Sequence, residues 1–457
     1  MNDRPRSPES LHLSDVLSAL SFALDLTEGQ PMGHSVRSGL IALWIAERLG
    51  LPLGVQRDLY FASMVKDVGC SSNASQVYRL FGSDDRATKA ALVRVDMRDL
   101  LRAGLTLLSR TAPDQPWPVR ARRIVEFARA APREAMRLVE TRCDRGAQLA
   151  NDMGLGRAVG EGVRALEEHW DGGGQPRGLS GEDIPLLSRL LSLARSLEVF
   201  AVRDGAEAAV EVVRSRSGRW FDPTLVRACE GIEPHLVAWC AMDTHTLRDR
   251  MGDAEPGGAA LLAGPQGLDR VALQFSRVVD AKSPFTASHS KRVGDLAGDV
   301  ARELGWTATE VADARRAGLL HDLGKLSVPN TILDKPGALT ENEWHVMRQH
   351  AHYTERILAH VSGFERHAFE VGAHHERLDG RGYCRGIAGE DVPALARVLS
   401  VADVYDALSS NRPYRDALAT EHVLELMERD RGVGFDSDCL DALRFALASA
   451  GDGLRAA

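Results

Sequence analysis

The chain has 457 residues, enough for two or three domains, and its 44% hydrophobic and 26% charged residues are typical of a protein with buried cores. A net charge of −8 excludes a general attraction for nucleic acids or anionic membranes, so we expect neither as a partner. The sequence shows no apolar run long enough to span a membrane, no signal-peptide pattern and no disulfide-like cysteine spacing, and therefore predicts a cytoplasmic protein.

Apolar residues recur at every third or fourth position through most of the chain, as in residues 293–304. This spacing is typical of amphipathic helices, and few segments alternate with the period of two that indicates a strand. Glycine and proline interrupt the pattern near residues 255–267, which is typical of a linker. We therefore predict an all-α fold with a first domain over 11–240, a linker over 241–268 and a second domain over 269–457.

The two predicted domains resemble each other in sequence. Residues 171–185 align without a gap with residues 379–393, and nine of the fifteen positions are identical. A second block aligns residues 34–37 with residues 289–292. Such specific repetition indicates an internal duplication of one helical bundle. The two blocks align with different offsets, which predicts a helical insertion in the first copy at about 71–141.

The second copy contains histidines and aspartates in apolar sequence surroundings. The candidate metal ligands are His289, His321, Asp322, His350, His374, His375 and Asp403. Imidazoles and carboxylates converging in an apolar setting suit a divalent transition metal. Seven ligands are too many for one ion and suit two, with Asp322 placed to bridge them. A metal pair that activates a hydroxide is suited to phosphoryl transfer.

Two of these assignments have alternatives. Considered alone, His321 and Asp322 are equally consistent with a solvated pair on an ordinary helix. Asp406 lies one helical turn from Asp403 and is either a hydrogen-bond partner of a ligand or a solvated carboxylate.

The first copy lacks most of the candidate ligands. Lys66 aligns with His321, Arg142 with His350, Leu166 and Glu167 with His374 and His375, and Arg195 with Asp403. Three of these replacements are cations, which cannot bind a metal but can pair with the remaining carboxylates. We therefore predict that the first copy kept the fold and lost the ions, although its cations also allow an alternative role in holding an anion.

Several blocks of the second copy resemble the HD superfamily of metal-dependent phosphohydrolases, and within it the HD-GYP group that degrades cyclic di-GMP. The resemblance covers about residues 269–446 and rests on four blocks, at 321–325, 328–337, 374–383 and 403–415. It implies two HD-type bundles, the first of them degenerate. It also implies a phosphodiesterase that converts cyclic di-GMP to pGpG, with further hydrolysis to GMP, another cyclic dinucleotide or nucleotide substrate, and a non-catalytic nucleotide sensor as alternatives.

The same resemblance implies roles for individual residues. The seven candidate ligands match the family's metal site, and His289 matches its leading histidine. Asp322 and Lys325 are expected to be catalytic, with Lys325 on the scissile phosphate. The residues expected to bind substrate are Lys325, Arg412, Arg415, Asp379, Gly380, Gly382 and Tyr383. A solvated face is the alternative for the two arginines. The expected cofactors are two ions of iron or manganese, with zinc, nickel or magnesium as alternatives.

Two positions depart from the family pattern. The signature motif places Cys384 where the family has proline. Phe285 stands where some members carry a glutamate that allows a third metal, so two ions are expected rather than three. We also expect the first domain to pack on the second as a pseudo-twofold partner, with a homodimer as an open alternative.

Overall fold

The computed structural model describes most of the chain, namely residues 12–96, 99–256, 265–361, 363–411 and 416–455. Apart from two isolated β-bridges, the regular structure in these ranges consists of α-helices and short 3-10 helices, labelled η. The prediction of an all-α fold is therefore confirmed. None of the helices in these ranges combines the length and the hydropathy needed to span a bilayer.

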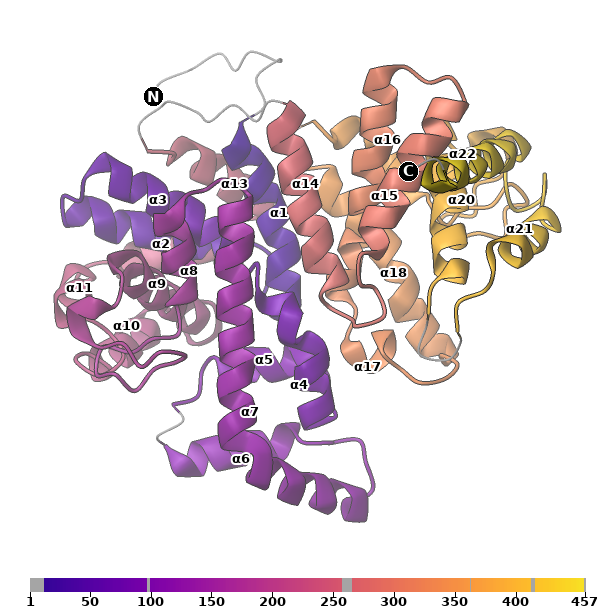
Figure 1. The fold of residues 1–457 in the computed structure, drawn as a ribbon. Helices are drawn as coiled ribbons and strands as arrows, with labels where there is room; N and C mark the ends of the chain where they lie inside the picture. The colour runs from indigo at the N-terminus through magenta and orange to yellow at the C-terminus, as the bar shows by residue number, and fades with distance from the viewer. Residues whose placement is uncertain (1–11, 97–98, 257–264, 362, 412–415, 456–457) are drawn as a thin grey trace. The chain divides into compact units, whose positions relative to one another are not determined.

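The chain divides into two compact units, Met1–Leu268 and Asp269–Ala457. The first unit contains α1(Leu13–Thr27), α2(His34–Arg48), α3(Leu53–Val65), η1(Cys70–Asn73), α4(Ala74–Phe81), α5(Asp85–Leu92), α6(Leu100–Arg110), α7(Trp117–Asp152), α8(Arg157–Arg164), η2(Gly181–Asp183), α9(Leu186–Asp204), α10(Ala206–Ser215), α11(Pro223–Ala228), α12(Glu233–Ala241) and α13(Thr244–Asp253). Helix α14(Pro265–Asp280) leads into the second unit (Figure 1).

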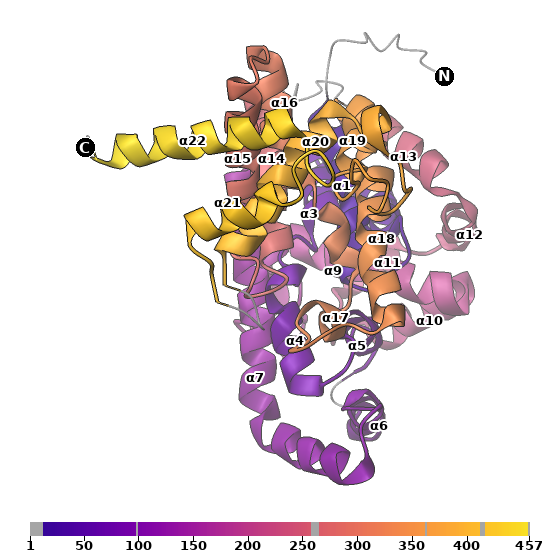
Figure 2. The same ribbon diagram turned by 90° about the vertical axis from the view of Figure 1, so that its right-hand side faces the viewer.

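The second unit continues the all-helical architecture. Its further elements are α15(His289–Glu303), α16(Ala308–Leu320), η3(Leu323–Ser327), α17(Asn330–Leu333), α18(Glu341–Leu358), η4(Glu365–His367), α19(Ala368–Gly372), η5(Gly389–Asp391), α20(Ala394–Ser409), α21(Thr420–Glu428) and α22(Ser437–Arg455). Figure 2 shows α18 in this unit from a second direction, and α18 packs against both α17 and α19.

Helix α2 lies in the core of the first unit, where it packs against α1, α3 and α9. Helices α4, α5, α6 and most of α7 fall within the stretch expected to be an insertion. The segment 241–268, expected to be a linker, contains α13, which packs on α1 and α2 through the fully buried Leu247 and Met251. Residues 257–264 of that segment lie outside the described ranges.

Helix α15 organises the second unit. Its apolar positions Val293, Ala297 and Val300 are fully buried, and the helix packs against α16, α20 and α22. Helices α15 and α16 approach closely at Gly294 and Gly318, because a Cβ on Gly318 would clash with the backbone of Gly294. This close packing brings the start of α15 next to the end of α16.

Two helices that border the site begin with a capping box. Thr307 and Glu310 form one at the start of α16, and Thr340 and Glu343 form the other at the start of α18. Between these helices, η3 lies against the backbone of α18, since a Cβ on Gly324 would clash with the carbonyl oxygen of His350. The glycine therefore permits the residues around η3 to reach the histidine on α18.

Candidate metal centre

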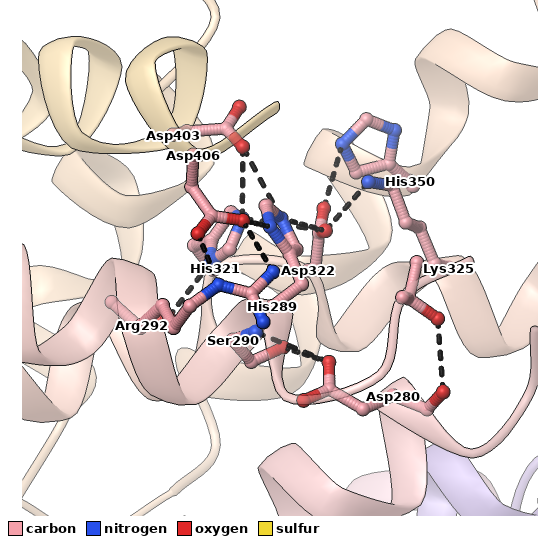
Figure 3. A network of polar contacts seen from close by, with 12 residues as sticks. Asp280, His289, Ser290, Arg292, His321, Asp322, Lys325, His350, Asp403 and Asp406 are labelled. Carbon is pink, nitrogen blue, oxygen red and sulfur yellow. Dashed lines mark hydrogen bonds and ion pairs between the residues drawn. The ribbon is translucent and has the colours of Figure 1, made fainter. Parts of the chain in front are cut away.

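The candidate ligands come from the ends and inner faces of five helices in the second unit. His289 begins α15, His321 and Asp322 follow α16, His350 lies in α18, His374 and His375 follow α19, and Asp403 lies in α20. In Figure 3, the labelled members of this set point toward one another. All but His375 are buried, and His375 is about one-fifth exposed.

Asp322 lies at the middle of this cluster, and its two carboxylate oxygens face different histidines. Oδ2 lies 3.4 Å from Nε2 of His289 and 3.3 Å from Nε2 of His321. Oδ1 lies 3.5 Å from Nε2 of His350. Asp403 adds a second carboxylate, with Oδ1 3.2 Å from Nε2 of His289. A carboxylate with histidines on both oxygens has the geometry of a bridging ligand.

The donor atoms form three overlapping groups, in each of which all donors lie within 4.8 Å of one another. The groups are His350 with His374 and His375; His289 with His321 and Asp322; and His321 with His374 and Asp403. Together they contain all seven candidate ligands. The structure therefore brings together the complete set of residues that the sequence suggested.

Hydrogen bonds at the outer nitrogen fix the orientation of four imidazoles. Three of them contact a backbone carbonyl oxygen through Nδ1, each at 2.7 Å. The pairs are His321 with Gly318, His350 with Met347, and His374 with Val371. Nδ1 of His289 lies 2.7 Å from Oδ2 of Asp406. In these positions Nδ1–H donates, and Nε2 presents its lone pair to the centre.

No contact of the inner nitrogens of these histidines has the geometry of a hydrogen bond, although carboxylate oxygens lie 3.2 to 3.5 Å from three of them. Nε2 of His289, His321, His350 and His374 is buried and lacks one, as does Oδ1 of Asp322. Buried polar atoms are rarely left without a hydrogen bond, because desolvation then goes uncompensated. Bound cations within the three overlapping donor groups would explain these five atoms, and imidazoles with carboxylates form the donor set of a divalent transition metal. The residues present therefore fit a metal.

The electrostatics divide the histidines of the cluster into two groups. Despite burial, Asp322 raises the pKa of His321 to about 9, so a metal would have to displace the proton of that ring. Burial lowers the pKa of His350 to about 4, and burial together with His321 and His350 lowers that of His374 to about 3. Both are therefore neutral at pH 7, as a ligand must be. Burial works against the charge of Asp322, but His321 and Lys325 outweigh it and hold its pKa well below the usual range.

Lys325 places a positive charge at the edge of the centre. Its Nζ lies 2.5 Å from Oδ2 of Asp322, and its side chain is 16% exposed. It follows Asp322 by three residues, so η3 fixes their separation. Lys325 thus combines contact with the Asp322 carboxylate and access to solvent, which suits a group that meets a charged substrate.

The loop that carries the signature motif, residues 376–386 (the signature loop), covers one side of the histidines. The ring of Tyr383 lies 4.5 Å from that of His375, centroid to centroid, and its backbone N–H donates to the carbonyl oxygen of His375. A Cβ on Gly382 would clash with the backbone of Glu376, so glycine permits this close fold. Tyr383 therefore belongs to the wall of the site.

Asp379 and Gly380 have a different position in this loop. Asp379 accepts hydrogen bonds from Arg377 and from the backbone N–H of Arg381, and Gly380 adopts a positive φ of 71°. These contacts shape the turn, and neither residue belongs to the three donor groups. Arg412 and Arg415, expected to hold substrate phosphates, lie outside the described residues.

Three further residues support the site. Asp406, which the sequence left open, accepts hydrogen bonds from Arg292 as well as contacting His289. Glu376 accepts hydrogen bonds from the backbone N–H groups of Arg385 and Gly386 and so holds the signature loop. The sequence analysis did not identify Glu376. The glutamate at the aligned position of the first unit, Glu168, was a signal that could have identified it. Arg348, whose guanidinium lies 5.6 Å from the centroid of the Tyr383 ring, was also missed and gave no sequence signal.

The first unit contains a corresponding buried centre with different chemistry. Lys66, aligned with His321, forms a buried ion pair with Asp67. Arg195 binds Glu167 through two hydrogen bonds of 2.5 and 3.0 Å, and Arg142 contacts the same carboxylate. Protein cations therefore neutralise the carboxylates of this centre.

One group in the first unit also brings metal-type donors together, namely Glu28, Asp67 and Cys70. Lys66 already neutralises Asp67, and Lys89 lies 3.5 Å from Glu28. Burial and the nearby Glu28 raise the pKa of the Cys70 thiol well above its usual value, so it stays protonated. This group therefore does not fit a metal.

Supporting contacts recur at aligned positions of the two units. Asp25 accepts from the backbone N–H and hydroxyl of Ser35 at 3.0 and 2.7 Å, and Asp280 accepts from those of Ser290 at 3.1 and 2.7 Å. His34 contacts Glu198 as His289 contacts Asp406. The surroundings of the two centres thus match, although the donors inside them differ.

Comparisons with known proteins agree with this geometry. A family model described as "HD domain" matches residues 117–225 and 274–439. A 3′3′-cGAMP-specific phosphodiesterase of Vibrio cholerae is 38% identical over 435 residues, which cover 95% of this chain and 94% of that protein. A cyclic di-GMP phosphodiesterase response regulator of Xanthomonas campestris is 40% identical over 175 residues, covering 37% of this chain and 46% of that protein.

A solved structure resembles nearly the whole chain. The crystal structure of a cyclic GMP-AMP-specific phosphodiesterase of V. cholerae is 35% identical, with a TM-score of 0.66, and the match covers 96% of this chain and 98% of that one. Similarity of sequence and structure thus extends over both units. The chain therefore belongs to the HD-domain family and is a phosphodiesterase of the HD-GYP type.

Proposed function

We propose that this protein opens a 3′3′-linked cyclic dinucleotide by hydrolysing one phosphodiester bond, using two divalent metal ions held by the seven donors of the second unit. The convergence of unpartnered imidazole nitrogens and carboxylate oxygens carries this proposal. When bound, such ions supply Lewis-acid polarisation of the scissile phosphate and lower the pKa of a nearby water molecule. Iron or manganese suits the mixed imidazole and carboxylate donors best.

The protein's own residues divide the remaining work. Asp322 bridges the two halves of the donor set through its two oxygens. The carbonyl oxygens beside His321, His350 and His374 hold these rings in one tautomer, so the centre is organised before substrate arrives. Preorganisation of this kind avoids the cost of reorienting ligands during the reaction.

Lys325 acts on the phosphate of the substrate. Its ammonium group lies at the solvent-facing edge of the centre, held by Asp322. There it stabilises the negative charge that develops on the phosphoryl oxygens as the bond to the leaving oxygen breaks. Tyr383 supplies a flat wall beside His375, and Arg412 and Arg415 hold the second phosphate of the ring.

The substrate that we propose is 3′3′-cyclic GMP-AMP, rather than the cyclic di-GMP expected from the sequence motifs. The relative and the solved structure that match both units are named for cyclic GMP-AMP. The relatives named for cyclic di-GMP in Xanthomonas and Thermotoga match 37% and 34% of this chain. Cyclic di-GMP is therefore the second candidate.

A comparison of turnover tests the substrate. The full chain, purified without chelator, is assayed with cyclic GMP-AMP, cyclic di-GMP and cyclic di-AMP, and kcat/KM is determined for each. We expect the highest kcat/KM for cyclic GMP-AMP. A higher value for cyclic di-GMP would transfer the assignment to the second candidate. If the chain hydrolyses none of the three cyclic dinucleotides, the proposal is refuted.

A further inference from the structure

A pair of adjoining cavities lies in the first unit, away from the residues of its buried centre. One has a volume of about 470 Å³ and the other about 420 Å³, and four residues line both: Asp96, Asp99, Arg102 and Arg216. The walls come from the end of α5 and the segment after it, from α6, from the end of α9, and from α10 with residues of the turn that follows it. Each volume lies in the range of small-molecule sites.

The lining of these cavities is strongly basic. Against two aspartates it presents six arginines, namely Arg94, Arg102, Arg110, Arg203, Arg216 and Arg219. The chain as a whole has a net charge of −8. Such a concentration of one charge is therefore a local feature, and it creates a field that attracts anions.

Only part of this positive charge is neutralised. Arg219 lies 2.9 Å from Asp96, Arg102 lies 3.4 Å from Asp99, and Arg203 pairs with Asp204 at 3.4 Å. Among the described residues, no carboxylate forms an ion pair with the other three arginines, which are Arg94, Arg110 and Arg216. These three guanidinium groups thus have no directly paired carboxylate, and only the more distant Asp96 and Asp204 act on Arg216 and Arg94 respectively.

Arg216 provides the second, independent observation. Its side chain is nine-tenths buried, and its Nη1 atom has no hydrogen-bond partner. The guanidinium lies over the ring of Trp220, 4.0 Å from the centroid, and near Phe200 at 5.3 Å. Its Nη2 atom donates to the carbonyl oxygen of Arg94. A buried guanidinium with an unsatisfied N–H is costly unless a ligand completes its hydrogen bonds.

Mutual repulsion among the arginines points the same way. Burial lowers the pKa of Arg216, Asp96 opposes this shift, and the neighbouring Arg219 and Arg102 lower the pKa further. Burial also lowers the pKa of Arg94, with Arg203 and Arg110 adding to the effect and Asp204 opposing it. A bound anion would relieve this repulsion, because the six arginines of the lining outnumber its two aspartates.

We propose that this arginine cavity binds a nucleotide bearing two or more phosphates. Guanidinium forks suit phosphate oxygens, and the charge of such a ligand matches the three arginines that form no ion pair. Phe200 lines the cavity and offers an aromatic face to a base. The site stands apart from the metal centre and does not depend on the proposed substrate. A 5′-phosphorylated linear dinucleotide and a nucleoside triphosphate share the required chemistry.

Calorimetric titration of the full chain, stripped of metal by chelator at low salt, tests this site. The probes are inorganic pyrophosphate, a 5′-phosphorylated linear dinucleotide and a nucleoside triphosphate. Removing the metal keeps the second unit from coordinating phosphate through bound ions. We expect at least one probe to bind, with an affinity that falls as salt is added. Tighter binding of the nucleotide probes than of pyrophosphate would add a contribution from the base.

Variants locate the binding. The double substitution Arg94→Gln and Arg110→Gln should weaken binding at least about tenfold, because each charged hydrogen bond contributes strongly. Arg216→Met should have a similar effect. Arg214→Gln is the matched control, since Arg214 lies on α10 with its side chain 53% exposed and outside the cavity lining, and it should bind as the wild type does.

Two outcomes would overturn the proposal. One is a wild-type chain that binds none of the three probes at low salt. The other is a double variant that binds them as tightly as the wild type. The double variant retains the buried Arg216, so it still tests the proposal if Arg216→Met does not fold. Circular dichroism checks that each variant is folded.

Discussion

The buried centres of the two units solve the same problem of charge in opposite ways. In the second unit, four imidazole nitrogens and a carboxylate oxygen point inward without hydrogen-bond partners. In the first unit, the carboxylates of the corresponding region form ion pairs with protein cations: Asp67 pairs with Lys66, and Glu167 pairs with Arg142 and Arg195. The comparison suggests a common rule: protein cations supply the counter-charge of the buried carboxylates in the first unit, and in our proposal metal ions supply it in the second.

The largest expected effect comes from removing the bridging carboxylate. Asp322→Asn should lower hydrolysis at least about 1000-fold, because the contribution of a metal pair amounts to several kcal/mol. Activity and metal content are measured on the same sample. Asp67→Asn, the aligned change in the first unit, should leave metal content unchanged. Wild-type activity in a folded Asp322→Asn chain would refute the assignment.

Removing the substitute cation of the first unit should reduce stability instead. Lys66→Met leaves Asp67 buried without its partner, which should lower the free energy of unfolding by about 3 kcal/mol. Urea denaturation measures the change. Lys291→Met is the control, because the exposed pair of Lys291 with Asp295 should contribute less than about 1 kcal/mol. Equal effects of the two changes would contradict the role given to Lys66.

Asp406, which accepts a hydrogen bond from His289, should strengthen metal binding without contacting the substrate. Asp406→Ala removes the acceptor that orients His289 and should weaken metal binding about 10- to 100-fold. Competition with a metal-binding dye measures this affinity. The aligned carboxylate of the first unit, Glu198, contacts His34, and Glu198→Ala should leave the affinity unchanged. A loss of the same size in both variants would show a general effect on folding.

Low pH should destabilise the first unit by protonating Glu167. Burial opposes the charge of this carboxyl, but Arg195 and Arg142 outweigh it and hold its pKa below the ordinary value of 4.5. A lowered pKa in the folded state contributes stability at higher pH, and this contribution is lost as the pH falls below about 4.5. Glu167→Gln should flatten the dependence of the urea midpoint between pH 6 and 3. An unchanged slope would contradict this explanation.

Much of the fold and of the candidate site was predictable from the sequence. Helical periodicity predicted the all-α fold, and apolar segments around His321, His374 and Asp403 indicated that these polar residues are buried. The seven residues do converge, although their role as ligands stays a prediction. The packing of the first unit on the second also stays a prediction.

Other features depend on contacts that a sequence does not contain. Asp406 was left open because a carboxylate one turn from Asp403 is equally well placed to face solvent, and only the contact with His289 decides. Arg348 reaches Tyr383 through a long side chain whose direction no periodicity encodes. The arginine cavity joins α6 and α10, which are far apart in the sequence.

Metal quantitation on the active full chain, purified without chelator, tests the central claim most directly. We expect about two divalent metal ions per chain. The Asp322→Asn chain should lose them, and the Lys66→Met chain should keep them. A chain that hydrolyses cyclic dinucleotides at full rate with no bound metal, or one whose metal depends on Lys66 rather than on Asp322, would contradict this account.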